Sequence, residues 1–267
     1  MKAMIFAAGL GTRLKPMTDT MPKALVPICG KPLIGHVARK LHAAGIDETV
    51  INVHHFAEQI EEWIASQDWM CMGDASAWSE GKMLVHVSDE RKMLLETGGA
   101  VLNARRYLED SGQFLIYNVD ILSDIDIQWF ALQAKQNALA TLLVSNRQSS
   151  RCLLFEPESM RLVGWMNNVT GEVRSPYPVD KDKCLKLAFS GIHIMSDKIF
   201  DAMHQYALAH ALYVFSDTPR FPIMDFYIWA CARYDIFGVQ ADGMTLLDVG
   251  KQGSIEQAEE LIRVLPL

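Results

Sequence analysis

No apolar run in this sequence approaches the ~20 residues that a transmembrane helix needs. The apolar start from Ala3 to Leu10 is too short for a signal peptide and runs directly into Arg13 and Lys15. The five cysteines are scattered, odd in number and free of any C-x-x-C spacing, which argues against a disulfide framework and against a zinc site. These absences predict a soluble protein in a reducing, cytoplasmic setting.

Several signatures of catalytic side chains are missing as well. The sequence contains no G-x-S-x-G elbow, no H-E-x-x-H pair and no cysteine with an obvious histidine partner. The pair His54-His55 has no acid or cysteine at a ligand spacing, so a structural role is favoured for it. Nothing here indicates a reaction that depends on a nucleophilic side chain or on zinc.

Positive charge is scarce but unevenly placed. The formal net charge is −7, yet residues 1–40 hold seven Lys and Arg side chains against one acid, Asp19. An acidic protein is a poor general surface for nucleic acid, which is bound mainly by clustered Lys and Arg. A local excess of cations instead suits a small anionic ligand. We therefore expect no nucleic-acid partner.

Short β-rich runs alternate with helical patterns along most of the 267 residues. Ala3–Ala7, Thr49–Val53 and Phe114–Asn118 read as buried strands, and "LLETGGAVLNARRYLED" reads as a loop that feeds a helix. This alternation predicts an α/β fold: a three-layer, Rossmann-like, mixed but mostly parallel sheet with helices on both faces. We expect one domain over residues 1–267, with an insertion at about 66–82 where the pattern fails.

The first predicted strand ends in a glycine loop, Gly9-Leu10-Gly11-Thr12-Arg13. A dinucleotide-binding turn needs a third glycine, where this chain has Leu14, and a ribose-binding acid that does not follow the second strand. A P-loop needs G-x-x-x-x-G-K-[ST], which is also absent. What remains is a loop whose backbone N–H groups can face an anion, with Arg13 and Lys23 in reach of it. Phosphate binding is the favoured interpretation, and solvated cations after an ordinary glycine turn are the alternative.

Two acids follow predicted buried strands, Asp120 after "FLIYN" and Asp248 after "GMTLL". Acids at the carboxyl ends of central strands lie at the edge where open α/β sheets bind ligands. If the two converge, their oxygens and those of a phosphate form the kind of site that Mg²⁺ prefers. Either acid alone could simply cap a turn.

The stretch "AAGLGTRLKPMTDTMPKALVPICGKPLI" resembles the signature of nucleotidyltransferases that act on sugar 1-phosphates, roughly A-A-G-x-G-[TE]-R followed by P-K-x-L-x-P-[VI]-x-G-x-P-[LM]-[IL]. The likeness continues in "LLETGG", "NVDILSDID", "FSGIHIM" and "DVG". It implies the nucleotide-diphospho-sugar transferase fold and an enzyme that joins a nucleoside triphosphate to a sugar 1-phosphate with the help of Mg²⁺. The short build resembles members that use UTP and N-acetylmuramate 1-phosphate, with GTP and mannose 1-phosphate as the near alternative.

The resemblance also implies roles for individual residues. Arg13, Lys23 and Asp120 would be catalytic, and Asp120 and Asp248 would hold the metal. The nucleotide would be bound by Ala8, Gly9, Gly11, Thr12, Arg13, Glu96, Thr97, Gly98 and Gly99. The sugar phosphate would be bound by Lys23, Asn118, Ser190 and Gly191.

Three features depart from the family pattern. Lys251 follows the D-V-G element where relatives usually have Thr, "NNVTGEVRSPYPVD" replaces a sugar-binding segment of larger relatives, and residues 66–82 are longer than the compact members need. Two other classes stay open: a non-catalytic homologue that binds nucleotide sugars, and an NAD-dependent oxidoreductase. Assembly into a homo-oligomer also stays open.

Overall fold

The computed structural model describes residues 1–73, 79, 81–214, 217–251 and 253–264. Contacts divide the chain into two compact units, the first built from Met1–Leu94, Arg106–Ile127 and Thr245–Leu267, and the second from Leu95–Arg105 and Gln128–Met244. The expectation of one domain over the whole chain stays a prediction. Each unit is described by itself below.

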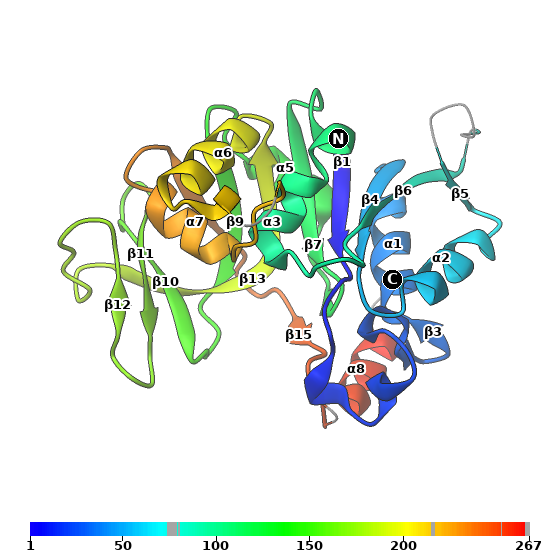
Figure 1. The fold of residues 1–267 in the computed structure, drawn as a ribbon. Coiled ribbons are helices and arrows are strands. Elements are labelled where there is room, and N and C mark those ends of the chain that lie inside the picture. The colour runs from blue at the N-terminus through cyan, green and yellow to red at the C-terminus, as the bar shows by residue number, and fades with distance from the viewer. Residues whose placement is uncertain (74–78, 80, 215–216, 252, 265–267) are drawn as a thin grey trace. The chain divides into compact units, whose positions relative to one another are not determined.

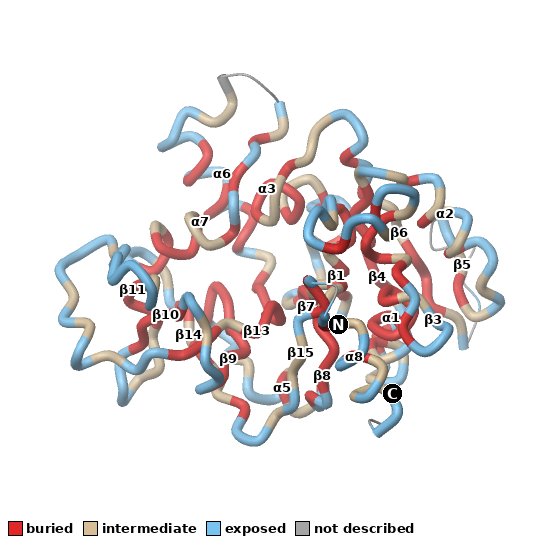
Figure 2. The backbone as a smooth tube through the Cα atoms, turned by 90° about the horizontal axis from the view of Figure 1, so that it is seen from below, coloured by how far each residue is buried: buried red, intermediate tan, exposed pale blue. Residues whose placement is uncertain are grey.

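The first unit contains five parallel strands in the order β7-β1-β4-β6-β5 (Figure 1). Their bounds are β1 Lys2–Phe6, β4 Glu48–Val53, β5 Met70–Met72, β6 Met83–Asp89 and β7 Gln113–Asn118. The central strands are continuous apolar runs because both of their faces are covered. In Figure 2 the buried colour accordingly follows β1, β4, β6 and β7.

Helices and two short ribbons complete the first unit. Its helices are α1 Leu33–Ala43, α2 Ala57–Ala65, α4 Arg105–Leu108 and α8 Gly253–Val264, and the 3-10 turns are Thr12–Leu14, Met17–Asp19 and Lys23–Leu25. One ribbon joins β2 Pro27–Ile28 to β3 Lys31–Pro32, and the other joins β8 Ile121–Ser123 to β15 Leu246–Asp248. The second ribbon brings the end of the chain back beside the segment that follows β7.

The second unit has strands in the order β12-β11-β10-β13-β9-β14, antiparallel except for the pair β14 and β9. The strands are β9 Ala140–Ser145, β10 Arg151–Phe155, β11 Leu162–Asn167, β12 Val173–Arg174, β13 Leu185–Ser196 and β14 Ile236–Gln240. The helices are α3 Glu96–Asn103, α5 Ile127–Gln133, α6 Ile199–Ala209 and α7 Ile223–Ala230, with a 3-10 turn at Leu212–Val214. Helix α3 packs against α6 and α7.

The α/β class predicted from the alternation is confirmed, and the three strands named above lie within a residue or two of their expected bounds. The structure adds two local details. Glu96 to Gly99 form the first turn of α3, and Met70–Met72 form an edge strand inside residues 66–82. That residues 66–82 are an insertion stays a prediction. Residues 74–78 and 80 of that segment lie outside the described residues. Among the helices that the structure describes, none combines the length and apolar character of a membrane span.

Candidate functional site

The glycine loop leaves the carboxyl end of β1 and folds back on itself. Gly11 has φ +63°, a left-handed conformation that glycine adopts at no steric cost, and Leu14 N–H donates to its carbonyl at 2.8 Å. The Thr18 hydroxyl donates to the same carbonyl, also at 2.8 Å. A Cβ at position 11 would lie 2.8 Å from Thr18 Cγ2 and 3.1 Å from Lys23 Cβ. Glycine here therefore lets the loop pack directly against the segment that carries Lys23.

Lys23 and Asp120 form an ion pair in the first unit, with Lys23 Nζ donating to Asp120 Oδ2. The two side chains are 11% and 19% exposed, so water screens the pair only in part. Asp120 follows β7, and Asn118 at the end of that strand lies opposite Phe6 of β1. The pair thus lies at the edge of the sheet from which the glycine loop departs.

Asp120 and Asp248 are brought together by the ribbon of β8 and β15. Asp248 lies opposite Ile121 in that ribbon, and Val249 N–H donates to the Asp120 carbonyl at 2.8 Å. A Cβ at Gly250 would lie 2.6 Å from Asp248 Oδ1 and 2.8 Å from Arg13 Nη2. The carboxylate of Asp248 and the guanidinium of Arg13 therefore reach the same small space, which any larger residue at position 250 would fill.

The side chains of Asp120 and Asp248 offer carboxylate oxygens as donors for a metal ion. Mg²⁺ in phosphate-transfer sites is commonly held by one or two carboxylates, with phosphate oxygens and water completing its shell. Asp120 and Asp248 match that pattern, and no group of three or more His, Cys, Asp or Glu side chains in the described part of the chain offers an all-protein cage. The donor set fits a Mg²⁺ ion that arrives with a phosphorylated ligand.

Ala8, Gly9 and Thr12 lie in the glycine loop of the first unit, whereas Glu96 to Gly99, Ser190 and Gly191 lie in the second unit. Glu96 has φ +61° and accepts hydrogen bonds from Arg220 at 3.0 and 2.9 Å, and the Thr97 hydroxyl accepts one from Ile223 N–H at 2.9 Å. A Cβ at Gly98 would lie 2.3 Å from the Phe221 ring, and one at Gly99 would lie 2.3 Å from the Pro219 carbonyl oxygen. The two glycines thus allow α3 to pack against the segment before α7. This packing is a structural reason for glycine at positions 98 and 99 that the sequence motif does not reveal.

Ser190 and Gly191 lie in β13, where its pairing with β9 shifts register between Phe189 and His193. The Ser190 hydroxyl is fully buried and has no hydrogen-bond partner in the described structure. Gly191 has φ +74°. Their proposed contact with the sugar stays a prediction.

Sequence reasoning missed Arg220, Asn52 and Glu90. Arg220 lies 124 positions after its partner Glu96, and no motif links the two. Asn52 and Glu90 lie at the carboxyl ends of β4 and β6, beside the glycine loop. The available signal for Glu90 was an acid that directly follows a strand, because β6 ends at Asp89.

A glycine loop, a part-buried Lys–Asp pair and the two acids Asp120 and Asp248 lie at one edge of a parallel sheet, the edge at which open α/β proteins bind ligands. The family model described as nucleotidyl transferase matches residues 2–151, and the chain belongs to that family.

Curated relatives refine the comparison. The chain is 38% identical over 118 residues to an N-acetylmuramate alpha-1-phosphate uridylyltransferase of Caulobacter vibrioides (44% of this chain, 45% of the relative). It is 43% identical over 127 residues to one of Neisseria meningitidis (47% and 49%). It is 27% identical over 168 residues to a mannose-1-phosphate guanyltransferase beta-B of Xenopus laevis (61% and 43%). The chain thus spans about half the length of the curated relatives it matches.

Solved structures agree on the fold. HddC from Yersinia pseudotuberculosis complexed with GMP-PN has a TM-score of 0.69 at 19% identity, covering 98% of this chain and 99% of that one. The CTP:phosphocholine cytidylyltransferase LicC from Streptococcus pneumoniae has a TM-score of 0.67 at 18% identity, covering 98% of both chains. At such identities the likeness establishes the fold alone.

Proposed function

We propose that this chain is a sugar-1-phosphate nucleotidyltransferase that joins a nucleoside triphosphate, UTP in preference, to N-acetylmuramate 1-phosphate or a similar sugar. The observation that carries the proposal is the cluster in the first unit: Gly11 packs on Lys23, Lys23 pairs with Asp120, and Arg13 and Asp248 meet at Gly250. Its charges suit a ligand with several phosphates.

The reaction needs positioning and cations more than proton transfer. A phosphate oxygen of the sugar 1-phosphate attacks the α-phosphorus in line, the bond from that phosphorus to the bridging oxygen breaks, and pyrophosphate leaves with the electron pair. The attacking oxygen is already anionic, so no side chain has to remove a proton. The difficulty is to bring several negative charges together and to stabilise those that develop on the leaving group.

The residues of the first unit would divide this work. The loop from Ala8 to Thr12 would offer backbone N–H groups to the triphosphate, and Arg13 would bind the β- and γ-phosphates. Lys23 would lie between the two substrates' phosphates, held in place by Asp120. Asn118 would orient the ligand from the end of β7. Asp120 and Asp248 would hold Mg²⁺, which supplies Lewis-acid stabilisation of phosphate charge when bound.

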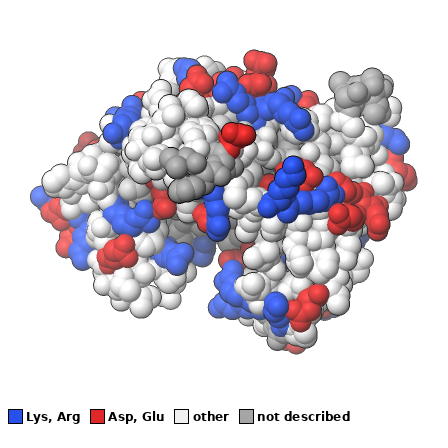
Figure 3. Space-filling view, viewed as in Figure 1, with Lys and Arg blue, Asp and Glu red and all other residues white. Residues whose placement is uncertain are grey.

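In the second unit, Glu96 and Thr97 would face the base and ribose, Gly98 and Gly99 would keep α3 close, and Ser190 and Gly191 would line the sugar. The unpartnered hydroxyl of Ser190 supports a polar ligand there, because a buried hydroxyl normally finds a partner. The proposal keeps the reducing, cytoplasmic setting expected from the scattered cysteines of the sequence. On the face drawn in Figure 3, basic and acidic side chains are interspersed. The partners that we propose are small phosphorylated ligands and no nucleic acid.

A substrate cross tests the proposal. ATP, GTP, CTP, UTP and dTTP are each combined with a panel of sugar 1-phosphates and Mg²⁺, and pyrophosphate release is followed. UTP with N-acetylmuramate 1-phosphate should give the highest kcat/KM. A preference for GTP with mannose 1-phosphate would select the guanylyltransferase alternative that the Xenopus laevis relative supports. Turnover with no pair would contradict the enzyme proposal and favour a non-catalytic homologue.

A further inference from the structure

Asn52 connects the glycine loop to a residue beyond a neighbouring strand. Its Oδ1 accepts a hydrogen bond from Ala7 N–H at 2.7 Å, and its Nδ2 donates to Glu90 Oε1, also at 2.7 Å. Asn52 is 4% exposed and Glu90 is 2% exposed. A side-chain amide and a carboxylate are thus buried together with the backbone donor that begins the loop.

The hydrogen bond between Asn52 and Ala7 gives an acceptor to a backbone N–H that lies just beyond the paired residues of β1 and β4. The register of β1 and β4 ends with Phe6 opposite Asn52, and Ala7 is the next residue along the chain. Ala7 is buried, so its N–H would be costly without an acceptor. The amide of Asn52 supplies that acceptor at the point where the chain turns from strand to loop.

Glu90 determines which way the amide of Asn52 faces. A carboxylate only accepts, so the NH₂ group of Asn52 must face Glu90, which leaves the amide oxygen toward Ala7. Glu90 is itself fixed by its backbone: its N–H donates to the Val53 carbonyl at 2.8 Å, and its carbonyl accepts from His54 Nδ1 at 2.7 Å.

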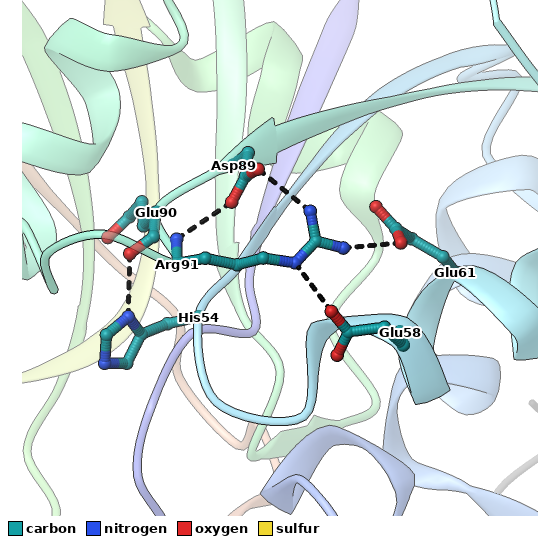
Figure 4. A network of polar contacts seen from close by, with 6 residues as sticks. All are labelled: His54, Glu58, Glu61, Asp89, Glu90 and Arg91. Atoms are coloured by element: carbon teal, nitrogen blue, oxygen red, sulfur yellow. Dashed lines mark hydrogen bonds and ion pairs between the residues drawn. The ribbon is translucent and has the colours of Figure 1, made fainter.

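Figure 4 shows a surface network of charged side chains beside Glu90. The next residue, Arg91, forms ion pairs with Asp89, Glu58 and Glu61 at 2.9, 3.1 and 2.6 Å. The Glu90 carboxylate points to the side opposite the Arg91 guanidinium in that view. The surface network therefore ties β6 to α2, whereas the Glu90 carboxylate accepts the hydrogen bond from Asn52.

We propose that Asn52 and Glu90 are positioning residues for the triphosphate loop. This inference deepens the proposed function and rests on it for the identity of the ligand. The hydrogen bonds that Asn52 donates to Glu90 and accepts from Ala7 fix where the loop leaves the sheet, and thereby fix the direction of the N–H groups that follow. Neither side chain needs to touch the nucleotide.

Four variants test this. Glu90→Leu replaces the carboxylate acceptor by an apolar side chain of similar volume. Asn52→Ala removes the amide that bonds to Ala7 and Glu90, and leaves space that water can occupy. If one of these variants does not fold, the other remains informative. Glu90→Gln retains an oxygen for the Asn52 NH₂ group and should restore function. Thr49→Val is the matched control, because Thr49 lies in the same strand, is fully buried, and its hydroxyl has no hydrogen-bond partner in the described structure.

The measurements are kinetic and structural. Glu90→Leu and Asn52→Ala should raise the KM for the nucleoside triphosphate about tenfold, the effect of one buried hydrogen bond, while the KM for the sugar 1-phosphate changes less than about twofold. Glu90→Gln and Thr49→Val should stay near wild type. In the free protein, hydrogen exchange of the backbone amides from Ala7 to Thr12 should accelerate in the first two variants, with the amides of β7 unchanged.

Wild-type exchange and wild-type KM in Glu90→Leu or Asn52→Ala would overturn the inference, as would equal losses in Glu90→Gln and Glu90→Leu. Failure of the proposed function is a separate result. If the wild-type protein turns over no substrate pair, the hydrogen-exchange comparison in the free protein still decides whether Asn52 and Glu90 hold the loop.

Discussion

Replacing Lys23 by Ala removes the cation that pairs with Asp120 in the described structure. Breaking a fully buried ion pair costs about 3 to 5 kcal/mol, because the remaining charge loses both water and partner. Here the side chains are 11% and 19% exposed, and water can reach Asp120 in the variant. We therefore expect Lys23→Ala to lower the free energy of unfolding by only about 2 kcal/mol, measured by urea denaturation.

The loss of activity should be larger than the loss of stability. A preorganised donor aimed at developing phosphate charge contributes about 10²- to 10³-fold to kcat. Lys23→Ala should therefore lower kcat/KM by at least that factor while the protein remains folded at the assay temperature.

The double variant Lys23→Ala with Asp120→Asn separates the two effects. Removing both charges leaves no unpaired carboxylate, so stability should recover by about 1 kcal/mol relative to Lys23→Ala. Activity should not recover, because the cation and one metal-binding carboxylate are both missing. Recovery of activity in the double variant would refute the reasoning, since it would mean that Lys23 acts only by neutralising Asp120.

Two further predictions concern the second unit. Gly99→Ala should lower the free energy of unfolding in urea by about 2 kcal/mol or more, because the new Cβ would lie 2.3 Å from the Pro219 carbonyl oxygen. Gly253→Ala is the control and should leave stability unchanged, since the space around position 253 is open. Equal stability of the two variants would contradict the packing argument. Burial lowers the pKa of His193 to about 3, so the unfolded chain binds a proton below about pH 6.5 that the folded chain does not. The free energy of unfolding should therefore fall by about 1.4 kcal/mol per pH unit as the pH drops from 6.5 toward 3, and His193→Gln should flatten that slope. Parallel stability curves for the two proteins would count against the assignment.

The sequence predicted those elements whose signal is local. The strands β1 and β7 are continuous apolar runs, and the glycine loop with Arg13 follows one of them directly. Asp120 and Asp248 could be placed at strand ends, but their approach depends on the ribbon of β8 and β15, which joins segments more than a hundred residues apart.

Other features have no local signal. Strand β5 is three residues long and pairs with β6 at the sheet edge, so its pattern is too short to detect. The first turn of α3 contains two glycines, which lower helix propensity, and packing against Phe221 and the Pro219 carbonyl compensates for this only in the folded chain. Asn52 and Glu90 reveal their link only when β4 and β6 are seen to lie side by side.

The most direct test of the central claim follows the phosphorus atoms themselves. Wild-type protein is mixed with UTP, N-acetylmuramate 1-phosphate and Mg²⁺, and the products are identified by ³¹P NMR. Attack at the α-phosphorus predicts pyrophosphate and the nucleoside diphosphate sugar in equal amounts, with no inorganic phosphate. Inorganic phosphate without the nucleoside diphosphate sugar would contradict the account, and so would the absence of any product across the full set of nucleotides and sugar 1-phosphates.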